Sequence, residues 1–302
     1  MMWNKPWSLR EGCVIGGGLI VVGALLQFSV GAINWDVFAW PVNMIVLLLY
    51  LILLFVGYVL RDKVYALRFL MTWKMAVPAL TYAVLLTVVM GITQQVPSDM
   101  SPIDPVGFSK MLSFWPFVLV YVLLATIIGL VSIRQVCHFR FRNIPSLLSH
   151  LGLFLVLTCG TLGSADMQRL KMFCEYDQPE WRALDEANQV HDLNVAIQLN
   201  RFIMEQDKKD KMPKRFASDV DIMTEDGRHI KTIIEVNKPY SINGWKIYQY
   251  GYDQAMGPMS RYSVFEWVRD PWLPFVYIGI GLLGLGAIGM FVMPVRKKEG
   301  IV

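Results

Sequence analysis

Six long apolar runs constrain the fold of this chain more than any other feature of its sequence. Each is close to the roughly 20 residues that an α-helix needs to cross a bilayer, and each is bounded by charged or turn-forming residues. The chain is 55% hydrophobic and 17% charged, whereas soluble domains are about 45–50% apolar and about 25% charged. An ordinary soluble enzyme is therefore excluded. The predicted spans cover residues 12–33, 41–60, 75–94, 113–133, 145–163 and 272–293.

The basic residues predict the orientation of these spans, because cytoplasmic loops of membrane proteins carry an excess of Lys and Arg. Outside residues 164–271, 12 basic residues fall in alternate segments, and only Lys110 falls in the opposite loops. We expect a multi-pass protein of a bacterial inner membrane with both termini cytoplasmic. The first run has no cleavage site followed by a polar chain, so we expect a retained helix. The 12 residues are Lys5, Arg10, Arg61, Lys63, Arg68, Lys74, Arg134, Arg140, Arg142, Arg296, Lys297 and Lys298.

Residues 164–271 differ from the rest of the chain in charge. They hold 15 Lys and Arg against 18 Asp and Glu, a net charge of −3, whereas the remainder has a net charge of +7. The fold class is thus an α-helical polytopic membrane protein of six transmembrane helices, with a β-rich extracytoplasmic domain between helices 5 and 6. Residues 1–163 form the five-helix membrane domain, and residues 164–271 form the periplasmic domain. Residues 272–302 supply the sixth helix and a basic cytoplasmic tail.

Strand signals dominate the second half of the periplasmic domain. Residues 193–200 alternate aliphatic and mostly polar side chains, as a strand with one buried face requires. Asp226-Gly227 and Asn243-Gly244 predict tight hairpin turns. Residues 262–268 form a further strand candidate. We expect an antiparallel sheet or sandwich, with residues 165–190 as a less regular, partly helical entry segment.

Several kinds of chemistry lack their motifs. None of Cys13, Cys137, Cys159 and Cys174 belongs to a Cys-x-x-Cys pair, so neither thioredoxin-type redox chemistry nor covalent haem attachment to this chain is indicated. No Walker loop, dinucleotide fingerprint or zinc-protease motif is present. The spans carry few acidic residues, unlike those of a proton-driven transporter. We therefore assign no catalytic residue and expect no nucleic-acid partner.

One histidine lies inside a predicted span. His150 follows Asn143 and Pro145, which suit a helix start, so it lies roughly 8 Å into the span. An ionisable group at that depth is a functional candidate. A neutral imidazole with one ring nitrogen hydrogen-bonded leaves the other nitrogen free to ligate iron. The alternatives are an interfacial histidine bonded to Ser146 one turn away, or a side chain facing lipid.

The other three histidines, His138, His191 and His229, are expected at the surface or in ordinary hydrogen bonds. The last span carries Gly279, Gly281, Gly284, Gly286 and Gly289, which allow another helix to approach closely. Two interpretations of these glycines stay open. They serve packing within this chain, or they form a docking face for a second membrane subunit.

Several segments of the chain are similar to a known family. Residues 149–154 and 160–166, with 216–220, 235–239 and 243–249, resemble the ResB family, also called CcsB, of the System II cytochrome c biogenesis pathway. The N-terminal block, residues 3–43, resembles the CcsB half of Bacteroides-type fused CcsB–CcsA proteins.

The resemblance implies a function. Such proteins act with a CcsA membrane subunit to export haem and attach it covalently to apocytochrome c. This chain is then not catalytic alone but a subunit of a holocytochrome c synthase, with haem b held transiently and shared with the partner. His150 is the position that fits the axial ligand of the haem iron. The Trp-rich motif of CcsA is missing, and Trp35-Asp36 does not replace it, so a separate CcsA is expected. The alternative is a membrane scaffold or assembly factor for a respiratory complex that binds no haem.

Overall fold

A computed structural model of the chain describes residues 3–97, 100–206 and 213–292. The chain divides into two compact units, which are described separately. The helical unit combines Met1–Ala165 with Trp272–Val302, and the β unit is Asp166–Pro271. The predicted basic tail at residues 296–298 lies outside the described residues.

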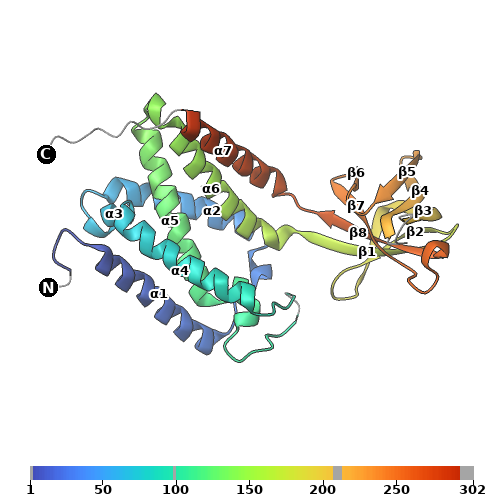
Figure 1. Cartoon of the computed structure of the whole chain (residues 1–302), viewed down its shortest axis with the longest axis horizontal. Coiled ribbons are helices and arrows are strands. Elements are labelled where there is room, and N and C mark those ends of the chain that lie inside the picture. Colours follow the sequence, from blue (N-terminus) through green and yellow to red (C-terminus); the bar gives the residue numbers. More distant parts are fainter. Residues whose placement is uncertain (1–2, 98–99, 207–212, 293–302) are drawn as a thin grey trace. The chain divides into compact units, whose positions relative to one another are not determined.

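Within the described residues, six helices are long and apolar enough to cross a membrane, which confirms the predicted helical class (Figure 1). The fifth and sixth of them flank the β unit, as predicted. A short helix that the sequence did not suggest, α3 (Tyr65–Leu70), connects the second and third spans. The spanning helices are α1 (Leu9–Val30), α2 (Val42–Leu60), α4 (Trp73–Ile92), α5 (Trp115–Cys137), α6 (Ile144–Gly163) and α7 (Leu273–Val292).

The helix ends differ from the predicted ends for local reasons. Helix α1 begins at Leu9, before the apolar run, because Ser8 and Glu11 form a capping box around its first turn. Helix α5 continues to Cys137, past the predicted end at residue 133. The charge of Arg134 ends the apolar run there, but neither glycine nor proline follows to end the helix.

Helix α5 is the centre of the helical unit, since it contacts α1, α2, α4 and α6. One apolar cluster joins α2, α5 and α6 through Leu54, Leu130 and Phe154. A second joins α4 and α5 through Met75, Ala79 and Ile127. Figure 1 shows α5 passing between its neighbours.

Helices α6 and α7 pack closely at glycines. A Cβ atom at Gly152 of α6 would lie 2.5 Å from the carbonyl oxygen of Gly279 in α7. Gly286 meets Pro145 and Ser149 of α6 in the same way. Because no side chain separates the backbones, the two helices approach to near van der Waals contact. Of the five glycines of α7, Gly279, Gly286 and Gly289 thus serve packing within this chain, and nothing lies within 4 Å of a Cβ atom at Gly281 or Gly284.

The β unit is an eight-stranded antiparallel sheet in its described residues, with the order β5-β4-β3-β2-β1-β8-β7-β6. The predicted strands are confirmed. The Asn243-Gly244 turn has the two positive φ angles that such turns need, 48° and 80°, whereas at Asp226-Gly227 only Gly227 has a positive φ, 78°. The strands are β1 (Gln168–Glu175), β2 (Pro179–Leu184), β3 (Val190–Gln206), β4 (Pro213–Thr224), β5 (His229–Glu235), β6 (Tyr240–Ile242), β7 (Trp245–Tyr252) and β8 (Tyr262–Arg269).

The expectation of a partly helical segment at residues 165–190 was wrong. Apart from one short 3-10 turn at Ser164–Asp166, the segment forms β1 and β2. Leu170, Met172 and Cys174 are buried at alternate positions of β1, and the side chains between them are exposed. This period of two is the pattern of a half-buried strand, and it lies in a sequence that lacks the β-branched residues by which strands are usually predicted.

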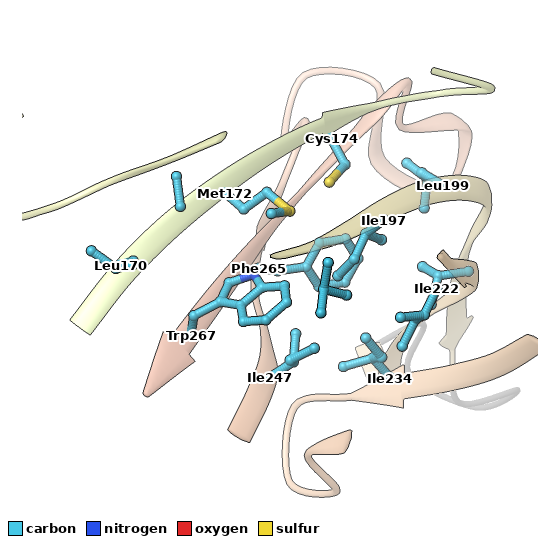
Figure 2. Packing of buried hydrophobic residues seen from close by; sticks show 13 residues of the cluster. Leu170, Met172, Cys174, Ile197, Leu199, Ile222, Ile234, Ile247, Phe265 and Trp267 are labelled. Atoms are coloured by element: carbon cyan, nitrogen blue, oxygen red, sulfur yellow. The ribbon is translucent and has the colours of Figure 1, made fainter. Parts of the chain in front are cut away.

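The sheet is rolled around one apolar core (Figure 2). Ile234 of β5 and Ile247 of β7 belong to the same cluster although their strands are far apart in the sheet order. A buried polar link crosses the same interior, since the Ser218 hydroxyl of β4 donates to Gln249 Oε1 of β7 at 2.6 Å. The Ser218 hydroxyl also lies 2.8 Å from that of Ser263 in β8. These contacts join strands that are not hydrogen-bonded neighbours, as rolling of the sheet requires.

Glycine packing of α6 against α7 predicts a position-specific loss of stability. In Gly279→Leu the new Cβ atom would lie 2.8 Å from the Gly152 carbonyl oxygen, so the helices must separate. We expect a cost of roughly 1–3 kcal/mol, typical of overpacking, and a lower midpoint of thermal unfolding in detergent. Gly281→Leu is the matched control, because nothing lies within 4 Å of its Cβ position. Equal midpoints for the two variants would contradict the packing.

Candidate functional site

The structure places His150 near the start of α6, half-buried, with one ring nitrogen fixed. Its Nδ1 lies 2.7 Å from the backbone carbonyl oxygen of Ser146, one turn earlier. A carbonyl oxygen only accepts, so Nδ1 carries the proton and donates it. In the neutral ring Nε2 then holds a lone pair. No hydrogen-bond partner of Nε2 is found in the part of the chain that the structure describes.

This bond is the one that the interfacial alternative predicts, and it is equally the one that ligation needs. A metal-bound histidine commonly donates its other ring N–H to a carbonyl or carboxylate, which sets both the tautomer and the ring orientation. The geometry therefore presents an oriented nitrogen donor. A ring that faces lipid can make the same bond to its own helix, so this bond alone does not separate the three alternatives.

A hydrogen-bonded chain connects His150 to α5. Gln135 Nε2 donates to the Ser146 hydroxyl oxygen at 2.9 Å, and that oxygen lies 3.3 Å from His150 Nδ1. Gln135 Oε1 is buried and has no hydrogen-bond partner within the described residues. A buried polar atom without a hydrogen-bond partner lowers the stability of the fold. The Gln135 amide therefore adds a polar group to an otherwise apolar helix bundle.

Basic side chains line an open hollow at the ends of α2 and α5 and the start of α6. We call it the basic hollow; it has a volume of about 360 Å³ and is formed by Arg61, Arg134, Gln135, His138, Arg140 and Asn143. Arg61 donates to the Tyr58 carbonyl oxygen at 2.8 Å, and Arg134 donates to that of Met71 at 3.3 Å. These bonds fix the guanidinium groups of two of the three arginines that form the hollow. No acidic residue is among those that form the hollow.

The remaining histidines have ordinary surroundings. His138 is exposed, and its Nδ1 lies 3.1 Å from the Tyr58 hydroxyl. In the β unit, His191 Nε2 lies 2.8 Å from Asp185 Oδ2, and this hydrogen bond holds the pKa of the Asp185 carboxyl below its usual value. His229 is exposed at the start of β5.

The cysteines and carboxylates of the described residues form no cluster of metal ligands. Within the described residues no group of three His, Cys, Asp or Glu side chains is placed to hold a metal ion. The cysteines are all free thiols, and burial raises the pKa of Cys174 far above its usual value. His150 accordingly belongs to no such group of three within the described residues.

The fold and this site define a multi-span membrane protein with an inserted rolled sheet and an oriented histidine near the start of one spanning helix. Residues 138–260 match the model of the ResB-like family, so this region of the chain is ResB-like, as the sequence resemblance indicated. The matched region contains α6 with His150 and most of the β unit. No curated protein is significantly similar to the chain.

Among solved structures, Cytochrome c Heme Lyase CcmF is similar to this chain at 14% sequence identity and a TM-score of 0.38. The aligned region covers 95% of this chain and 46% of that one, so the chain spans less than half the length of CcmF.

Sequence reasoning singled out His150 but missed Gln135 and the basic hollow. Gln135 lies just past the predicted end of its span, where polar residues are usual and therefore indicate no function. Arg61, Arg134 and Arg140 served only as orientation signals. These three arginines come together in the hollow because α2 packs against α5. That packing cannot be predicted from any local sequence pattern.

The Gln135–Ser146 hydrogen bond predicts non-additive stability changes. Ser146→Ala removes the hydroxyl and leaves the Gln135 amide without its partner, so we expect a cost of about 1–3 kcal/mol. Adding Gln135→Leu removes the unpaired amide as well and should recover most of that loss. Thermal unfolding of both variants in detergent measures the difference. Additive destabilisation in the double variant would contradict the hydrogen-bonded pair.

Proposed function

We propose that this protein is a subunit of a haem export and cytochrome c maturation system. In this proposal it works with a CcsA-like membrane subunit to deliver haem across the membrane for covalent attachment to apocytochrome c. Two observations support it, the ResB-like region at residues 138–260 and the histidine that this region contains. The observation that carries it is the Nδ1–H bond of His150 to a backbone carbonyl, which leaves Nε2 available for iron.

The chemistry of haem suits this arrangement. Haem b has no covalent bond from its porphyrin to the protein, so axial side-chain ligands to its iron, of which histidine is one, help to hold it in an apolar bundle. His150 supplies one ligand, and a histidine of the CcsA-like subunit supplies the other. Because each chain would supply one ligand, the assembled pair would hold haem more tightly than either chain alone. The chain is not catalytic by itself in this scheme.

The proposed orientation follows from charge. Arg61, Arg134 and Arg140 gather at one end of the helical unit, where positive residues favour the cytoplasmic side of a bacterial inner membrane. An even number of spans then returns the chain to that side, and the β unit between α6 and α7 faces the periplasm. There it contacts apocytochrome c or the periplasmic loops of the partner subunit.

A second candidate function is a membrane scaffold or assembly factor that binds no haem. The observation in its favour is that the His150–Ser146 bond satisfies one ring nitrogen without any ligand. The two functions differ in haem content, which is directly measurable.

Replacement of His150 tests the proposed function. In a complex co-expressed with its CcsA-like partner, His150→Gly should lower haem affinity by at least the 10–100-fold that outer-shell substitutions typically cost metal sites. Added imidazole should restore part of the haem absorbance, since it replaces the missing ligand. His229→Ala, in the exposed start of β5, is the control. An unchanged haem spectrum in His150→Gly, or wild-type complex without haem, would contradict the proposal.

Cysteine labelling tests the orientation. A membrane-impermeant maleimide should label Ser241→Cys in intact spheroplasts, because Ser241 is exposed on β6. Cys137, exposed at the end of α5, should react only after permeabilisation. Each is tested with the remaining cysteines replaced by serine. The reverse labelling order would place the β unit in the cytoplasm and refute haem delivery to the outside.

A further inference from the structure

We infer that the basic hollow binds the propionate carboxylates of haem while His150 ligates its iron. This inference rests on the proposed function and adds a second contact to the same site. The hollow was defined from Arg61, Arg134 and Arg140 with their polar neighbours. It offers what a carboxylate requires, namely guanidinium groups that donate paired hydrogen bonds in a planar fork.

The charge of the hollow is not neutralised within the described residues. Arg140 has no ion pair or hydrogen bond from its side chain there, and the only ion pair of Arg61 is with Asp62 at 3.6 Å. The Asp62 side chain is 72% exposed, so that pair is weak. Like charges gathered in one hollow repel one another unless an anion joins them. An oxyanion is therefore the ligand class that the hollow favours.

The position of the hollow matches the shape of haem bound at His150. Asn143 forms part of the hollow and lies seven residues before His150, or about 10 Å along α6 at 1.5 Å rise per residue. A porphyrin whose iron lies at His150 carries its propionates on one edge, at a similar distance from the iron. The ring then lies beside the apolar part of α6 while its charged edge reaches the end of the bundle.

The two parts are also linked by hydrogen bonds. Gln135 forms part of the hollow and donates to Ser146, whose hydroxyl oxygen lies 3.3 Å from His150 Nδ1. A ligand in the hollow therefore contacts Gln135, which is hydrogen-bonded to the Ser146 side chain beside the imidazole. This coupling distinguishes the hollow from an unrelated basic patch.

Haem and haem dimethyl ester separate the two contacts, because the ester has the same iron and ring but no carboxylates. The wild-type chain with its CcsA-like partner, in nanodiscs of neutral lipid, should bind haem at least about tenfold more tightly than the ester, as one charge-assisted hydrogen bond provides. Arg61→Gln with Arg140→Gln should remove this preference by weakening haem binding alone. Lys63→Gln with Arg68→Gln is the control of equal charge on the same side of the helical unit.

The outcomes are distinct. Equal wild-type affinities for haem and ester would overturn the inference and leave the His150 ligand intact, whereas failure of both to bind would overturn the proposed function itself. In the Arg61→Gln, Arg140→Gln variant, an equal loss of affinity for haem and for the ester would also overturn the inference. Such a loss does not depend on the propionates and indicates a general loss of structure. A phosphate of an anionic lipid is the competing source of the same chemistry. If phosphatidylglycerol in the nanodisc abolishes the wild-type preference for haem, the headgroup is the occupant and the inference is wrong.

Discussion

The close approach of α6 to α7 is the contact on which the rest of this structure depends. The β unit is inserted between these helices, so the chain leaves α6 at Gly163 and re-enters the helical unit at Trp272. Gly163 lets the Trp272 ring pack against the end of α6, and Gly152 and Gly279 bring the two backbones together deeper in the bundle. In an apolar solvent no hydrophobic force drives such an association, so tight packing at small residues must supply it. The same contact anchors the helix that carries His150.

A polar group inside this bundle is tolerated because its hydrogen bonds are local. His150 bonds to a carbonyl of its own helix, so its orientation does not depend on a distant loop. Gln135 adds a link to α5 but leaves one amide atom buried and unpaired in the described structure. Such incomplete satisfaction is costly, because the low dielectric of an apolar interior penalises an unpaired polar atom. The candidate site thus combines one oriented ring nitrogen with a basic hollow of which Gln135 forms part.

Much of the architecture was predictable because its signals are local. Span length and composition identify the membrane helices, and Gly227 and Asn243-Gly244 mark hairpins because few residues accept their positive φ angles. The entry strand β1 was missed because its buried face is made of Leu170, Met172 and Cys174 rather than β-branched residues. His150 was found because an ionisable residue in an apolar run is conspicuous in any sequence. Its function as a haem ligand remains a prediction.

The sequence by itself determined which segments can cross a bilayer, which segment is polar enough to face water, and which histidine lies within an apolar run. Each of these depends on the free energy of transferring neighbouring residues from water, which composition and period already contain. Only the tertiary structure decided which glycines of α7 pack, how the sheet rolls around the Ser218–Gln249 link, and where the arginines meet. These features join residues that are far apart in the chain. Their contacts depend on how whole helices and strands pack, and no local pattern records that.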